Sequence, residues 1–87
     1  MSRRVAPATL LADVQRIWPQ VAGRAIAAQA EPVAERGGVV TVACASSVWA
    51  AELDLLAPGL VERLNGALGA ARVRSLRCRA GTGVRAR

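Results

Sequence analysis

The chain has 87 residues, enough for one hydrophobic core and too few for two. It contains no histidine and two cysteines, Cys44 and Cys78, so the sequence predicts no Cys/His zinc site, no disulfide framework and no bound metal or cofactor. Its twelve basic residues outnumber six acids and give a net charge of +6, which favours an anionic partner.

The first element that the sequence predicts is a helix. Apolar residues recur at helical spacing over residues 8–17, and Pro7 suits the first turn of a helix. Pro19 disfavours helical geometry at Trp18, so we expect the chain to bend at this pair. A second short helix is predicted over residues 19–28.

A β-hairpin is predicted next. Residues 30–34 indicate a weak strand, which Pro32 places at a sheet edge because proline cannot donate to a ladder. The turn lies at residues 36–38, and residues 39–45 show the clearest alternation in the sequence. The face expected to point inward holds Val40, Val42 and Cys44.

One long helix follows the hairpin, with an N-cap at Ser46 or Ser47 and a C-terminal glycine at Gly69. Pro58 removes one backbone hydrogen bond, so we expect the helix to kink or divide at Pro58-Gly59. Its apolar stripe covers roughly 120° of the helix surface. The stripe consists of Trp49, Leu53, Leu56, Leu60, Leu64 and Leu68.

A last strand is predicted over residues 72–79, with Leu76 and Cys78 inward and Arg77 and Arg79 in solvent. The strand–helix–strand connection should place it parallel to residues 39–45 in the same sheet. The sequence therefore predicts a single α+β domain over residues 1–87, with a three-stranded sheet covered on one face by helices. Its ordered core is expected over residues 8–79 and a flexible basic tail over residues 80–87.

The arginines are distributed unevenly. Residues 1–71 hold six arginines and six acids, whereas the last sixteen residues hold six arginines and no acid. Guanidinium groups without neighbouring carboxylates favour phosphate binding, because they engage phosphate oxygens bidentately and release counterions. The alternative is a solvated edge strand and tail that charge keeps soluble. The predicted nucleic-acid site consists of Arg72, Arg74, Arg77, Arg79, Arg85 and Arg87.

A partner-binding patch is predicted on the long helix. Val48 and Leu55 lie one heptad apart and point away from the apolar stripe on an ideal helix. The alternative is that a kink at Pro58 turns Leu55 into the core. Trp18 and Trp49 align with apolar stripes, so we expect burial rather than base stacking, and nucleic-acid binding that is indifferent to sequence.

The sequence predicts neither an enzyme nor a membrane protein. The acids are scattered, histidine is absent, and no phosphate loop follows a strand. No apolar run approaches the roughly 20 residues of a membrane span, and Pro7 and Asp13 interrupt the stretch that a signal peptide would need. We therefore expect a cytoplasmic protein without a small-molecule substrate.

Four segments occur in the order and spacing of a known domain: WPQVAG at residues 18–23, GVVTV at 38–42, SVWAAEL at 47–53, and LVERL at 60–64 followed by Asn65 and Gly69. Together they resemble the N-terminal domain of the bacterial DciA proteins over roughly residues 8–79. The resemblance implies a fold similar to the type II K-homology fold and a non-enzymatic role in DNA replication. It implies DNA and the replicative helicase DnaB as partners, with the domain helping the helicase onto single strands.

Two alternatives remain at this point. An RNA-binding K-homology module grips the nucleic-acid backbone with a GxxG loop between two helices. The string GALG at residues 66–69 has this pattern but stands at the end of the predicted helix, whereas the helix joint reads LAPGL at residues 56–60. The other alternative is a protein–protein adaptor without a nucleic-acid role, whose arginines face an acidic protein surface.

Overall fold

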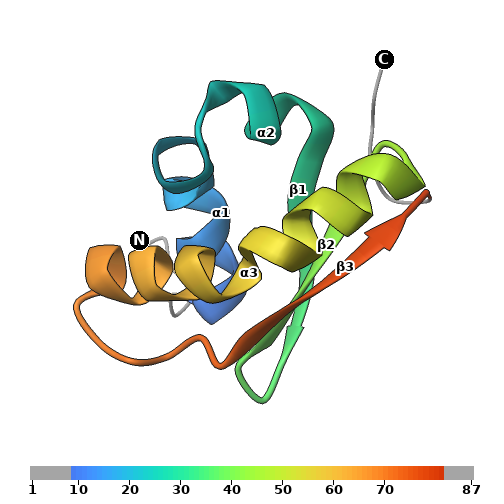
Figure 1. Ribbon diagram of the computed structural model, residues 1–87. Helices are drawn as coiled ribbons and strands as arrows, with labels where there is room; N and C mark the ends of the chain where they lie inside the picture. The colour runs from blue at the N-terminus through green and yellow to red at the C-terminus, as the bar shows by residue number, and fades with distance from the viewer. Residues whose placement is uncertain (1–8, 82–87) are drawn as a thin grey trace, which may run out of the picture.

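The computed structural model describes residues 9–81 (Figure 1). The elements follow the order α1 (Leu10–Ala22), α2 (Arg24–Gln29), β1 (Ala30–Arg36), β2 (Val39–Cys44), α3 (Ser47–Leu68) and β3 (Ser75–Ala80). The sheet has the order β1-β2-β3, with β2 antiparallel to β1 and parallel to β3. Figure 1 shows the helices gathered on one side of the sheet, with α3 crossing it. The predicted α+β arrangement is confirmed, and it is compatible with the type II K-homology order.

The first helix is longer than the sequence predicted. It begins after Thr9, whose hydroxyl accepts a backbone N–H of the first turn at 3.0 Å, and it continues through Pro19. The predicted bend at Trp18-Pro19 is therefore wrong. The chain turns instead at Gly23, whose φ of 93° is one that other residues rarely adopt. Proline has a helix-compatible φ, and the buried indole of Trp18 holds the backbone helical despite the missing N–H.

The hairpin is confirmed, and β1 forms a protected edge of the sheet. Trp18 Nε1 donates to the Ala30 carbonyl at 2.9 Å, and Gln15 Nε2 donates to the Pro32 carbonyl at 3.0 Å. The pairing with β2 slips between Pro32 and Ala34, as at a β-bulge. Side-chain cover, a proline and a bulge all discourage another chain from pairing with this edge.

The long helix α3 is one continuous element. Ser46 caps its start, where the hydroxyl accepts the Trp49 N–H at 3.2 Å, and Gly69 ends it in the left-handed conformation at φ 79°. Both predicted ends are confirmed. A kink or a division was predicted at Pro58-Gly59, and the division does not occur, because the helix runs through both residues.

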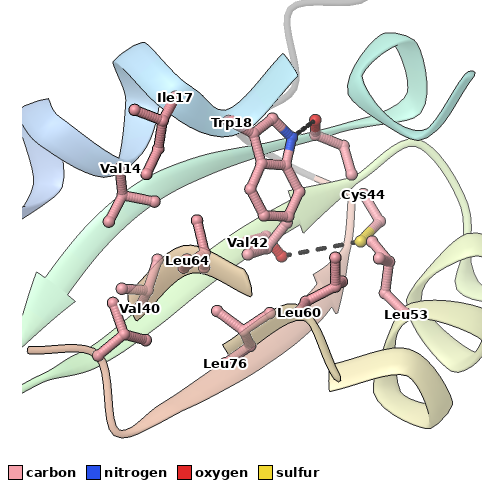
Figure 2. Packing of buried hydrophobic residues seen from close by; sticks show 12 residues of the cluster. Val14, Ile17, Trp18, Val40, Val42, Cys44, Leu53, Leu60, Leu64 and Leu76 are labelled. Atoms are coloured by element: carbon pink, nitrogen blue, oxygen red, sulfur yellow. Dashed lines mark hydrogen bonds between the residues drawn. The ribbon is translucent and has the colours of Figure 1, made fainter. Parts of the chain in front are cut away.

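The core lies between the sheet and the helices (Figure 2). Leu56 was expected in it but is 47% exposed. It lies about 60° from the centre of the buried stripe on a helical wheel, at the stripe's margin, whereas Ala57 packs against the core. Trp18 is buried, but Trp49 is only partly buried, so the expectation of a fully buried indole is wrong for Trp49. The buried members of the core cluster are Val14, Ile17, Trp18, Ala30, Val40, Val42, Cys44, Leu53, Leu60, Leu64, Val73 and Leu76.

Within residues 9–81, no helix combines the length and the apolar character needed to cross a membrane.

Candidate nucleic-acid interface

The connection from α3 to β3 is held by one side chain. Asn65 Oδ1 accepts the backbone N–H groups of Arg72 and Val73 at 3.0 and 2.8 Å, and Asn65 Nδ2 donates to the Val73 carbonyl at 2.9 Å. Val73 is buried beside it. Strand β3 therefore starts at Ser75, three residues later than predicted, and Arg72 and Arg74 precede the strand.

Arg72 has an acidic partner. Its guanidinium lies 3.1 Å from Asp13 Oδ2 of α1, where the side chains of Arg72 and Asp13 are 40% and 17% exposed. Arg16 approaches the same carboxylate at 3.6 Å. The expectation that no carboxylate accompanies the arginine cluster is therefore wrong for Arg72, because folding brings α1 against the connection before β3. An arginine already paired with an acid contributes less to phosphate binding.

Arg74 lies against the hairpin turn. Its backbone N–H donates to the Gly38 carbonyl at 2.8 Å. A Cβ placed on Gly38 would lie 2.8 Å from Arg74 Cγ, so the stem of the arginine occupies the space that a side chain at residue 38 would need. The glycine thus permits this contact, and the contact fixes where the Arg74 side chain leaves the backbone.

Arg77 and Arg79 are the free cations of β3. Both are exposed, and neither forms an ion pair within residues 9–81. Leu76, just before Arg77, is buried, and Cys78, between the two arginines, is half-buried, which confirms the predicted alternation. The other two predicted arginines, Arg85 and Arg87, lie outside the described residues.

The sheet contributes a further arginine that the sequence did not single out. The pairing places Arg36 of β1 beside Val39 of β2, and Thr41 of β2 beside Arg77 of β3, all on the face turned away from the helices. Sequence reasoning placed Arg36 in the turn, whereas β1 extends to it. The one signal was its position next to the Gly37-Gly38 pair, which fixes the hairpin register.

The predicted partner patch is exposed. Val48 is 69% exposed and Leu55 80% exposed on α3, so the alternative in which Pro58 turns Leu55 into the core is wrong. Leu56 lies beside Leu55 and lines a groove between α3 and the junction of α1 with α2. That groove is formed by Ala22, Ile26, Leu56, Gly59, Leu60 and Arg63.

The two thiols are unsuited to metal binding or nucleophilic chemistry. Burial raises the pKa of Cys44 above its ordinary value and raises the pKa of Cys78 to about 12. Both therefore stay protonated at neutral pH, and the thiolate is the form that binds metals and attacks electrophiles. Among residues 9–81, no three side chains of the metal-binding types stand close enough to hold an ion.

Comparison with known proteins identifies the family. The family described as "Dna[CI] antecedent, DciA" matches residues 2–78. This chain belongs to the DciA family. The resemblance found in the sequence is thereby confirmed, and the free arginines of β3 lie on a DciA domain.

Relatives of this DciA domain include several UPF0232 proteins. A UPF0232 protein of Streptomyces avermitilis is 47% identical over 62 residues, which cover 69% of this chain and 34% of the relative. A UPF0232 protein of Rhodococcus jostii is 38% identical over 60 residues, covering 69% and 32%. One of Mycobacterium tuberculosis is 36% identical over 76 residues, covering 87% and 38%. The chain spans about a third of the length of these relatives.

Proposed function

We propose that this chain is the folded module of a DNA-replication accessory protein that binds nucleic acid through its arginines and docks on the replicative helicase DnaB. Membership of the DciA family supports the role in replication. The observation that carries nucleic-acid binding is the pair Arg77 and Arg79, exposed on one strand without an ion-pair partner in the described part of the chain. The module acts by binding and not by catalysis.

The arginines differ in what they contribute. Arg77 and Arg79 sit two residues apart on the same side of β3, so their guanidinium groups engage successive phosphates of one backbone. Arg74 adds a cation beside the hairpin turn, whereas Arg72 is partly neutralised by Asp13. Arg85 and Arg87, outside the described residues, belong to the proposed site as two further cations. Phosphate contacts carry no base information, so binding is indifferent to sequence.

The helicase contact uses the outer side of α3. Val48 and Leu55 expose two large apolar side chains on that side, and burying them against a partner removes apolar surface from water. This patch lies on the helix, apart from the arginines on the strands. Nucleic acid and helicase therefore bind the module at the same time.

The RNA-clamp alternative gains no support from the geometry. Residues 66–68 form the last turn of α3 and Gly69 is its cap, so the GxxG string does not lie between two helices. The adaptor alternative differs from the proposal in one respect: it requires the arginines to bind protein and leaves the affinity for nucleic acid low.

Nucleic-acid binding is tested by fluorescence anisotropy with a labelled oligonucleotide over a range of salt concentrations. Replacing Arg77 and Arg79 together by alanine should weaken binding to all sequences alike. It should also reduce the magnitude of the negative slope of log K against log salt by about one to two units. The matched control replaces Arg16 and Arg24, two exposed arginines on the helices. Equal losses in both double variants would mean that total charge matters and the strand site does not exist.

Helicase docking is tested by pull-down of the host's DnaB, with and without oligonucleotide. Leu55→Asp should abolish capture while the thermal unfolding temperature stays unchanged, because the side chain is exposed. Ala25→Asp, an exposed position on α2, introduces the same charge elsewhere and should leave capture intact. Unchanged capture by Leu55→Asp would remove the patch from the proposal.

A further inference from the structure

The face of the sheet that the helices leave uncovered has a shallow depression next to the hairpin turn. Its lining consists of Ala34, Glu35, Arg36, Val39, Thr41 and Arg77. Thr41 pairs with Ala34 on one side and with Arg77 on the other, so it lies at the centre of the floor. The depression thus spans all three strands.

Two cations flank this floor. Arg36 lies on β1 and Arg77 on β3, about 10 Å apart across two strand spacings. They are also offset by two residues along the strands, because Arg36 pairs with Val39 and Arg77 pairs with Thr41. Both are exposed, and neither forms an ion pair with any residue that the structure describes. The carboxylate of Glu35 accepts the Gly38 N–H at 2.8 Å, so it is engaged at the turn. The lining therefore carries two positive charges and one negative charge, with the negative charge held at the turn.

Thr41 supplies a polar group between the two arginines. Its side chain is half-buried and makes no hydrogen bond within residues 9–81. A hydroxyl flanked by two guanidinium groups matches the donors that proteins use on phosphate oxygens. Ala34 and Val39 complete a floor of small side chains that lets a phosphate approach closely.

We propose that Arg36, Thr41 and Arg77 form a phosphate subsite for the backbone of single-stranded nucleic acid. The subsite rests on the proposed nucleic-acid function and extends it from the edge strand β3 across the sheet to β1. The bound strand continues along β3 to Arg79, two residues beyond Arg77 on the same face. The tryptophans of the described residues lie on the helices, so the bases are not stacked on aromatic rings and point to solvent.

A single strand fits this geometry better than a duplex. The two arginines line one floor that spans three strands and is about 10 Å across, so a single backbone contacts both. A duplex presents two backbones separated by grooves of about 12 and about 6 Å. One backbone in the depression would leave the other beyond the sheet edge, where the described part of β1 offers Glu31 on this face.

The test measures binding of the full chain to a labelled oligothymidylate of about twenty nucleotides and to a duplex of equal length, by fluorescence anisotropy in a salt series. Arg36→Ala should lower the magnitude of the salt slope on the single strand by about 0.7, the value for one lost phosphate contact. Thr41→Val has nearly the same shape and should weaken binding about three- to tenfold with an unchanged slope, because the hydroxyl carries no charge. Arg24→Ala, an exposed arginine on α2, is the control and should change neither.

The outcomes separate the subsite from the broader function. If Arg36→Ala has the same affinity and salt slope as Arg24→Ala while the Arg77 and Arg79 double variant loses affinity, the subsite is overturned and nucleic-acid binding by β3 stands. If the unaltered chain does not bind either oligonucleotide, the proposed function itself fails. Tighter binding of the duplex than of the single strand overturns the assignment to a single-stranded nucleic acid. Displacement of the labelled strand by polyglutamate as effective as that by unlabelled oligothymidylate overturns it too. Equal thermal unfolding temperatures show that the variants are folded.

Discussion

The two faces of the sheet differ sharply although they alternate along the same strands. On β2, Val40 and Val42 are fully buried under the helices, whereas Thr41 between them faces the open side. On β3, Leu76 is buried and Arg77 is exposed. One alternation therefore builds the core and delivers the arginines to solvent. We therefore expect substitutions on the covered face to lower stability, and substitutions on the open face to weaken the proposed binding of nucleic acid.

The largest expected effect lies on the covered side. Trp18→Ala should lower the free energy of unfolding by about 3 to 5 kcal/mol, because a buried indole leaves a cavity. It also removes the hydrogen bond to the Ala30 carbonyl. Trp49→Ala should cost less, about 1 to 2 kcal/mol, since this ring is only partly buried. Urea denaturation measures both, and a larger loss for Trp49→Ala would contradict the assignment of Trp18 to the core.

A smaller loss of unfolding free energy is expected at the connection between α3 and β3. Asn65→Ala removes three hydrogen bonds to the connection before β3 and should cost about 1 to 3 kcal/mol. Asn65→Asp keeps the two accepted hydrogen bonds and should fall between the alanine variant and the unaltered chain. Thermal unfolding gives the order of the three stabilities. Identical stabilities would show that the connection before β3 does not depend on the Asn65 side chain.

Elements were predictable from the sequence where one local pattern fixed them. The alternation of side chains along residues 39–45 predicted β2. The heptad spacing of Val48 and Leu55, away from the apolar stripe, predicted that both are exposed. The bend at Pro19 was wrong because the packing of Trp18, which no local pattern shows, outweighs one lost hydrogen bond. The pairing of Arg72 with Asp13 joins residues far apart in the chain, so charge counting along the sequence missed it.

Alkaline pH should lower the stability of the fold through the thiols on the covered side of the sheet. Burial raises the pKa of Cys78 from 9.0 to about 12 and also raises the pKa of Cys44. A raised folded-state pKa stabilises the fold fully below the unfolded value, and this contribution is lost as pH rises through the folded-state value. The free energy of unfolding should therefore decline between about pH 9 and pH 12. Cys78→Ala should flatten the decline, and an equally steep decline in that variant would exclude the thiol as its cause.

The smallest effect on stability is expected on the open face. Arg77→Ala and Arg79→Ala together should change the free energy of unfolding by no more than about 0.5 kcal/mol, because both side chains are exposed and form no ion pair within residues 9–81. Urea denaturation checks this. A loss above about 2 kcal/mol would show that these arginines support the fold.

The most direct test of the difference between the faces compares methyl groups on one strand by nuclear magnetic resonance during titration with oligothymidylate. We expect the methyl signals of Val39 and Thr41, on the open face, to shift, while those of Val40 and Val42 beneath the helices stay in place. If the open-face signals stay unchanged while methyl groups of α3 beside β3, such as those of Val61, shift instead, nucleic acid binds between helix and strand, which would contradict binding on the open face.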